Sequence, residues 1–181
     1  YTNHLEEARA FIKERVLEMH VHQGCEVLYT ESSARLLAEG HYPTLAGSDI
    51  VLVEFSPDMS FRQLADAAAS FGMRGYGVLF AHVERYEALR NLKNVQKLRN
   101  EFGVHMQMNT NTIIGKKGFF TERWVRHMLE DGHIDCVATD AHNLSYRPCK
   151  MMQCHEMLAM KYGSDFADEL CGGFQRRLLE I

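Results

Sequence analysis

The chain has 181 residues, of which 46% are apolar and 24% are charged, and its formal net charge is -4. This length and composition provide one sizeable hydrophobic core, which excludes a disordered tail or a fibre, so we expect a single domain over residues 1–181. The charge is mildly negative and no block of lysine or arginine occurs, which argues against nucleic acid as a partner.

Two further features of the composition concern the compartment. No apolar run approaches the ~20 residues that cross a bilayer, and no secretory signal sequence opens the chain. The cysteines are odd in number and include no Cys-x-x-Cys pair, which favours free thiols over a disulfide framework; they are Cys25, Cys136, Cys149, Cys154 and Cys171. We therefore expect a cytoplasmic protein without direct membrane insertion.

The apolar pattern of the first part of the chain predicts a helix followed by alternating strands and helices. The helix covers residues 4–19, a strand over 19–30 ends near Glu26, and a second helix covers 33–40. The run DIVLVEFS, residues 49–56, is continuously apolar before its glutamate. Such a run is typical of a strand that is buried on both faces of a parallel sheet.

The rest of the chain repeats this alternation. Ser60 is a plausible N-cap, and the expected elements are a helix over 60–73, a strand over 75–82, a helix over 84–103, a strand over 104–111, a helix over 120–132, a strand over 134–143 and two closing helices. Strands that alternate with helices predict the α/β class with a mostly parallel sheet. A βα barrel opens with a strand, so about two βα units, roughly 50 to 60 residues, are expected upstream of this chain.

Metal-ligand or polar side chains recur near the ends of the predicted strands at intervals of about 28 residues, the length of one strand with its crossover helix. They are Glu26, Glu54, His82, Asn109, and Asp140 with His142. Because the carboxyl ends of parallel strands meet at one edge of a sheet, this spacing predicts a shared site.

The residue types at these ends favour a metal. A charged Glu54 inside an apolar strand would cost several kcal/mol if it were buried without a partner. Asp140 and His142 are two residues apart on an extended chain, so both side chains face the same way. Mixed carboxylate and imidazole ligands suit Mn, Fe or Zn. We therefore predict a metal cluster formed by Glu26, Glu54, His82, Asp140 and His142.

Taken singly, each of these residues has a structural interpretation, because His82 is equally typical of a satisfied core histidine and Glu54 of an ion pair. The combination at consecutive strand ends favours function. The other histidines lack such a position and are expected to be surface or core residues: His4, His20, His22, His41, His105, His127, His133 and His155.

Several segments together resemble one protein family. They are GCEVLYT around Glu26, VEFS at Glu54, HVERY over 82–86, QMNTNTIIGKKG over 107–118, and TDAHN over 139–143 followed by Arg147 and Pro148. From about Leu5 to Ile181 the chain resembles the bacterial tyrosine-protein phosphatases of capsular and extracellular polysaccharide synthesis. These enzymes belong to the polymerase and histidinol phosphatase (PHP) superfamily.

The resemblance implies a distorted TIM-like (βα) barrel that holds up to three divalent metal ions, often manganese. Glu26 would bridge two ions, Glu54 and His82 would complete one shell, and Asp140 and His142 would bind separate ions. The family opens with a His-x-His strand, an Asp-Asp-Gly loop and a further histidine. None of these motifs stands before Tyr1, so four expected ligand positions and the first strands are expected to be missing from this chain.

The resemblance also implies a reaction. Arg85 and Arg147 match positions where the family places arginines against the substrate phosphate. We hypothesise that a metal-bridging hydroxide attacks phosphorus in line with the tyrosine oxygen, while the two guanidinium groups stabilise the transition state. The implied substrate is the phosphotyrosine-rich tail of a membrane-associated tyrosine autokinase.

Three alternatives remain open from the sequence. The segment CGGFQRR, Cys171 to Arg177, satisfies the Cys-x5-Arg spacing of cysteine-dependent phosphatases, whose loop follows a strand. A small-molecule phosphatase, for example one acting on histidinol phosphate, would share the metal motifs. The missing upstream motifs would also suit a non-catalytic protein that binds a partner without hydrolysis.

Overall fold

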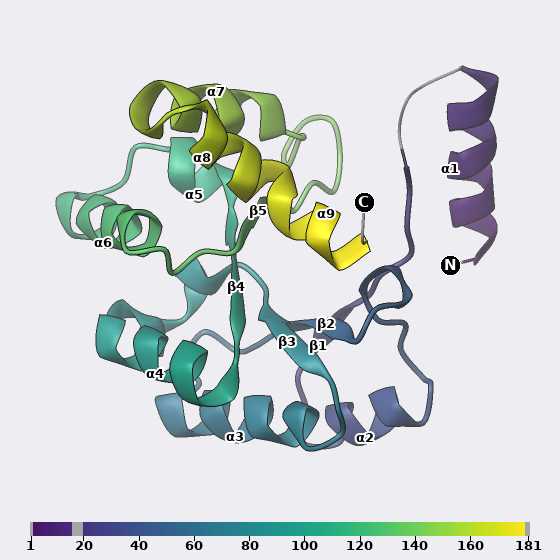
Figure 1. Cartoon of the computed structure of the whole chain (residues 1–181), viewed down its shortest axis with the longest axis horizontal. Helices are drawn as coiled ribbons and strands as arrows, with labels where there is room; N and C mark the ends of the chain where they lie inside the picture. The colour runs from purple at the N-terminus through teal and green to yellow at the C-terminus, as the bar shows by residue number, and fades with distance from the viewer. Residues whose placement is uncertain (1, 16–19, 180–181) are drawn as a thin grey trace.

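A parallel five-stranded sheet organises the computed structural model, which describes residues 2–15 and 20–179. The spatial order is β1-β2-β3-β4-β5, from β1 (Glu26–Leu28), β2 (Ile50–Glu54), β3 (Gly77–Phe80) and β4 (His105–Asn109) to β5 (Cys136–Ala138) (Figure 1). Each crossover thus leads to the adjacent strand. This is the order of a βα barrel, whereas a doubly wound sheet reverses direction near its centre.

Helices connect and flank the strands. They are α1 (Thr2–Glu14), α2 (Ser33–Ala38), α3 (Phe61–Gly72), α4 (Leu92–Phe102), α5 (Thr110–Ile114), α6 (Phe119–Glu130), α7 (Met151–Tyr162), α8 (Ser164–Asp168) and α9 (Phe174–Leu179). Figure 1 shows α2, α3 and α4 along one side of the sheet, and α5, α6 and α7 grouped beyond the end of β4. In the same view α1 stands apart from the other helices.

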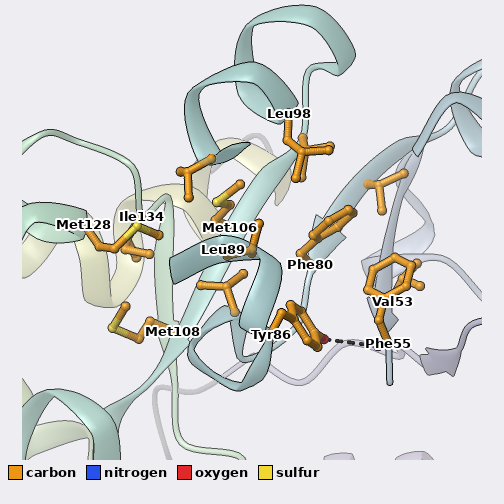
Figure 2. Packing of buried hydrophobic residues seen from close by; sticks show 14 of the residues in the cluster. Val53, Phe55, Phe80, Tyr86, Leu89, Leu98, Met106, Met108, Met128 and Ile134 are labelled. Atoms are coloured by element: carbon orange, nitrogen blue, oxygen red, sulfur yellow. Dashed lines mark hydrogen bonds between the residues drawn. The ribbon is translucent and has the colours of Figure 1, made fainter. Parts of the chain in front are cut away.

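The two faces of the sheet bury different residues. Val53, Phe80 and Met106 lie on the face that packs against the helices, and they belong to the main core (Figure 2). On the opposite face, Leu79 of β3 and Cys136 of β5 form a smaller cluster with Phe174 of α9. The apolar runs of the strands are therefore buried on both faces, as the sequence predicted for a parallel sheet.

The predicted α/β class and parallel sheet are confirmed, but a closed barrel is not. Within the described residues β1 pairs only with β2 and β5 only with β4, so the sheet is open at both edges. Closure of a barrel requires the first and last strands to pair.

Three predicted elements were wrong in their extent. The strand predicted over 19–30 with its end near Glu26 is confined to Glu26–Leu28, so Glu26 begins the strand; residues 16–19 lie outside the described residues. The strand predicted over 134–143 ends at Ala138, and the left-handed backbone of Asp140, with φ of 49°, contradicts the extended chain expected to carry Asp140 and His142. The helix predicted over 84–103 is broken into the short 3-10 turns Val83–Arg85 and Glu87–Arg90, and α4 follows. Asn91 caps α4 by accepting a hydrogen bond from the backbone N–H of Lys93, which fixes the later start.

In the part of the chain that the structure describes, no helix has the length and apolar character needed to span a membrane.

Candidate metal centre

Three predicted ligand residues converge beside the carboxyl ends of β2 and β3. Glu26 is the first residue of β1, Glu54 is the last of β2, and His82 follows β3 by two residues. One ligand atom from each lies within 4.8 Å of the other two. The Nε2 atom of His82 is 2.8 Å from Oε1 of Glu26 and 3.1 Å from Oε1 of Glu54. His82 is almost fully buried, whereas each carboxylate keeps about a third of its surface exposed and remains accessible from solvent.

Tyr86 fixes the positions of two of these strand ends. Its hydroxyl donates a hydrogen bond to the carbonyl oxygen of Ala81 at 2.7 Å. It also accepts one from the backbone N–H of Phe55 at 3.1 Å, which Figure 2 shows. Phe55 follows Glu54 and Ala81 precedes His82, so one buried side chain sets the spacing of both ligand residues. Burial, together with the nearby charge of Glu54, raises the pKa of Tyr86 far above its usual value, which keeps the hydroxyl protonated.

A chain of side-chain amides continues along the same edge. The backbone N–H of His82 donates to Oε1 of Gln107 at 2.8 Å, and Nε2 of Gln107 donates to Oδ1 of Asn109 at 2.9 Å. The Nδ2 atom of Asn109 lies 3.4 Å from Oδ2 of Asp140. This network connects the ends of β3, β4 and β5, so displacement of one residue is transmitted to the others.

Arg85 joins the ligand residues of β2 and β3 to the loop after β5. Its Nη1 lies 3.2 Å from Oε1 of Glu54 and 3.1 Å from Nε2 of His82, and its Nη2 lies 2.7 Å from Oδ2 of Asp140. Arg147 also approaches Asp140, with Nη1 at 3.3 Å from Oδ2. Two guanidinium groups therefore face the carboxylates from one side of the site.

His82 and Asp140 have left-handed backbone conformations, with φ of 34° and 49°. Such values are uncommon for residues other than glycine and cost of order 1–3 kcal/mol, so the surrounding contacts must hold them. Both residues belong to the predicted metal set. Strain at these two positions suits a functional site better than a purely structural one.

The side chains fit a divalent cation. Two carboxylate oxygens and the imidazole Nε2 of His82 form the kind of donor set that Mn, Fe or Zn accepts. Nε2 of His82 faces both carboxylate oxygens and Nη1 of Arg85, so it is the ring nitrogen that would bind an ion at this position. Nδ1 of His82 is buried without a hydrogen-bond partner, so the partner that usually orients a ligating imidazole is missing among the described residues.

The structure does not bring all five predicted ligands into one group. Asp140 contacts the cluster through Arg85, and its side chain is 14% exposed. His142 is more than half exposed, and its Nδ1 lies 2.8 Å from the backbone carbonyl oxygen of Asp140. The orienting roles of Tyr86 and Gln107 were not predicted, although the aromatic residue in HVERY offered a signal for the first.

The Cys-x5-Arg alternative finds no support in the geometry. Cys171 lies in a π-helical turn, Glu169–Gly173, between α8 and α9, and no strand precedes it. Burial and the nearby charge of Asp168 raise the pKa of its thiol, which disfavours the reactive thiolate. Pocket size does not identify the site either, because a pocket of about 770 Å³ lies at the opposite ends of the strands, beside Ile50 and His105.

Comparisons with known proteins identify related sequences. Residues 1–180 match the family model described as capsular polysaccharide synthesis, CpsB/CapC. The chain is 32% identical to tyrosine-protein phosphatase CpsB of Streptococcus pneumoniae, over 96% of this chain and 73% of that protein. It is 30% identical to the protein of the same name from Streptococcus agalactiae, over 87% of this chain and 67% of that protein.

A solved structure shares the fold. It is described as one of the crystal structures of YwqE from Bacillus subtilis and CpsB from Streptococcus pneumoniae, unique metal-dependent tyrosine phosphatases. The TM-score is 0.83 at 23% sequence identity, over 97% of this chain and 71% of the other. Together with the family match over nearly its whole length, this shows that the chain belongs to the CpsB/CapC family of capsular polysaccharide synthesis.

Proposed function

We propose that this protein hydrolyses phosphotyrosine in proteins with the help of divalent metal ions. The observation that carries the proposal is the convergence of Glu26, Glu54 and His82 beside the guanidinium of Arg85. A cation site next to a guanidinium group suits a phosphate ester, because both can neutralise its oxygens. The similar proteins that are named tyrosine-protein phosphatase support phosphotyrosine as the ester.

Glu26, Glu54 and His82 would hold the first ion, and Asp140 and His142 would serve further ions, up to three in an intact site. Manganese is our first choice, with iron or zinc as alternatives. When bound, such ions supply positive charge for the phosphate and lower the pKa of a water molecule. Gln107 and Asn109 hold the backbone of His82 and the carboxylate of Asp140 in place.

Arg85 and Arg147 would bind the phosphate oxygens. Both guanidinium groups already face Oδ2 of Asp140, at 2.7 Å and 3.3 Å, so both can turn to an anion at the same place. The planar fork of arginine can donate two hydrogen bonds to phosphate, and this geometry stabilises charge that spreads over its oxygens in the transition state.

The wider setting is part of the proposal. A family of capsular polysaccharide synthesis suggests the tail of a membrane-associated tyrosine autokinase as the protein substrate, and a cytoplasmic enzyme would reach it. The sequential strand order, in which each crossover leads to the adjacent strand, supports a PHP-type barrel.

The direct test is hydrolysis of a phosphotyrosine peptide with and without added manganese, with Asp140→Ala as the control. Turnover that requires manganese and is lost in the control supports the proposal. Faster turnover of histidinol phosphate than of the peptide would support a small-molecule phosphatase instead. Tight binding of the phosphopeptide without turnover at any manganese concentration would identify a non-catalytic binding protein.

A further inference from the structure

A groove lies beside the metal centre, between α5, the loop 115–118, α6 and α7. Its volume is about 220 Å³, and its walls include Thr112, Lys117, Val125 and Met157. Figure 1 shows these three helices grouped beyond the end of β4. None of the metal-centre residues lines the groove, so it is a separate feature of the surface.

Helix α5 connects the groove to the metal centre. This helix begins directly after Asn109, whose side chain approaches Asp140. The hydroxyl of Thr112 donates a hydrogen bond to Oε1 of Glu84 at 3.0 Å, and Glu84 is the neighbour of Arg85. A helix of five residues extends roughly 7 Å along its axis. A bound peptide whose phosphate lies at Arg85 would therefore reach the groove within a few residues of the phosphotyrosine.

The charge of the groove is positive. Lys116, Lys117 and Lys161 line it, and none of them forms an ion pair with any residue that the structure describes. The one carboxylate in the lining, that of Glu122, accepts a hydrogen bond from the backbone N–H of Lys117 at 3.1 Å. Ammonium groups that lack protein partners and line a concave surface suit an anionic ligand.

The backbone of the loop is built to stay close to α5. A Cβ atom at Gly115 would lie 2.6 Å from the carbonyl oxygen of Asn111, a separation that real Cβ atoms do not show. Glycine therefore allows the loop to fold back, and the same Cβ position lies 3.5 Å from Cε of Lys117. The close approach places the exposed side chain of Lys117 beside the loop at the groove.

We propose that this groove binds acidic side chains, aspartate or glutamate, of the substrate segment that flanks the phosphotyrosine. The inference rests on the proposed function, because it assumes that a peptide carries the phosphate to Arg85. An extended peptide advances about 3.3 Å per residue, so the acidic residues would stand roughly two to five positions from the phosphotyrosine. Opposite charges at such a distance select among substrates, since they add affinity to the right peptide and none to a neutral one.

Two exposed aromatic residues next to the loop 115–118 point to a second type of ligand, an anionic membrane, which has to be distinguished from a peptide. Phe119 and Phe120, which follow the loop, are 72% and 84% exposed, with ring centroids 5.7 Å apart. Lysines next to exposed aromatic rings also occur where proteins touch anionic membranes. We favour the peptide because the three lysines, although exposed, line a concave groove that a segment of chain can enter and a flat bilayer surface cannot.

The test compares two phosphotyrosine peptides of equal length, one with aspartate at positions two to five on both sides and one with alanine there. The enzyme is the manganese-loaded chain, and the quantity is the ratio of kcat/KM for the acidic peptide to that for the neutral one. We expect a ratio of about ten for the native chain, through KM, and about one for the double variant Lys116→Glu with Lys117→Glu.

The control variant is Lys13→Glu with Lys93→Glu, which makes the same change in net charge at two exposed lysines on α1 and α4. It should keep the ratio of the native chain. Gly115→Ala, which displaces the loop without changing charge, should lower the ratio. A ratio of one in the native chain, or an equal fall in the control variant, would overturn the inference while leaving the proposed function intact.

If neither peptide is hydrolysed, the proposed function is contradicted. Peptide binding then tests the proposal for the groove separately. Fluorescence anisotropy should then show tighter binding of the labelled acidic peptide, lost in the Lys116→Glu, Lys117→Glu variant. Equal binding of the two peptides contradicts the inference. Sedimentation with anionic phosphatidylglycerol vesicles that depends on the two lysines, without any peptide preference, would assign the surface to a membrane instead.

Discussion

Arg85 and Asp140 are 55 residues apart in sequence, yet Nη2 of the arginine lies 2.7 Å from Oδ2 of the aspartate. The same guanidinium contacts Glu54 through Nη1 at 3.2 Å. One cation thus holds together carboxylates from β2 and from the loop after β5. A substrate phosphate would compete for this group, so Arg85 is well placed to change partners during binding.

Replacement of Arg85 should therefore reduce catalysis strongly. We expect Arg85→Ala to lower kcat/KM for a phosphotyrosine peptide by about 100-fold or more, the size seen when one donor to a developing charge is removed. Arg85→Lys should recover only part of the loss, because an ammonium cannot donate the same fork of hydrogen bonds. Steady-state kinetics measure both. Arg74→Ala, at an exposed arginine of the loop after α3, is the matched control; full activity of Arg85→Ala would refute the role.

Metal affinity should depend on His82. Its Nε2 is within 3.1 Å of both glutamate oxygens, so His82→Ala removes one of three converging donors. We expect at least a tenfold weaker binding of manganese, measured by isothermal titration calorimetry on the folded protein. His41→Ala, at an exposed histidine paired with Glu39, should bind as the native chain does. Unchanged affinity in His82→Ala would remove this residue from the ligand set.

The sequence predicted the ends of β2 and β3 correctly but misplaced Glu26, which begins β1, and it did not predict the contacts between the strands. Glu54 and His82 were predictable because a polar side chain at the end of a buried apolar run is costly without a partner. The contacts of Gln107 with His82 and Asn109 cross from one strand to another, and no local pattern records them. The left-handed backbone at His82 is uncommon for a residue other than glycine, and the contacts around it hold that conformation.

The helix predicted over 84–103 shows how tertiary structure overrides a local pattern. The amphipathic spacing continues through this range, but Tyr86 turns inward to bond Ala81 and Phe55, which ends regular helix near that point. The cap at Asn91 was readable in the sequence as an Asn before an apolar-periodic segment. The helical spacing of apolar residues nevertheless predicts one continuous helix over 84–103.

Removal of the Tyr86 hydroxyl should destabilise the protein. In Tyr86→Phe the buried N–H of Phe55 and the carbonyl of Ala81 each lose a hydrogen-bond partner, which costs about 1–3 kcal/mol in the free energy of unfolding. Urea unfolding measures the change, and metal affinity should fall as well because Glu54 and His82 flank these groups. Tyr76→Phe, at a partly exposed tyrosine, should change stability by less than about 0.5 kcal/mol. Equal stability of the two variants would contradict the bracing role of Tyr86.

The lowered pKa of Asp135 predicts how the stability of the folded protein changes with pH. Burial opposes its ionisation, but hydrogen bonds from His105, Arg99 and the backbone N–H of Met106 outweigh burial and lower the pKa of the carboxyl below its ordinary 3.8. Because the folded pKa is the lower one, the contribution is present above the unfolded pKa and is lost as pH falls through the folded pKa. Stability should therefore decline below about pH 4.

Asp135→Asn should remove this contribution. We expect about 2–4 kcal/mol of lost stability at pH 7, because the largely buried guanidinium of Arg99 loses its partner, and a flatter decline between pH 4 and pH 2. Urea unfolding across this pH range measures both quantities. The exposed Asp66→Asn is the control. Parallel pH curves for native chain and Asp135→Asn would show that other carboxyl groups govern acid unfolding.

The last prediction separates metal catalysis from thiol catalysis. Cys171 lies in a helical turn and its thiol has a raised pKa, so it should play no part in turnover. We expect Cys171→Ser to keep kcat/KM within about twofold, and iodoacetamide to leave the rate unchanged, because a protonated thiol alkylates slowly. Cys149 is exposed and provides the internal reference, since mass spectrometry should find it modified first. Inactivation that follows modification of Cys171, and that Cys171→Ser prevents, would restore the cysteine mechanism and remove the need for Glu54 and His82 as ligands.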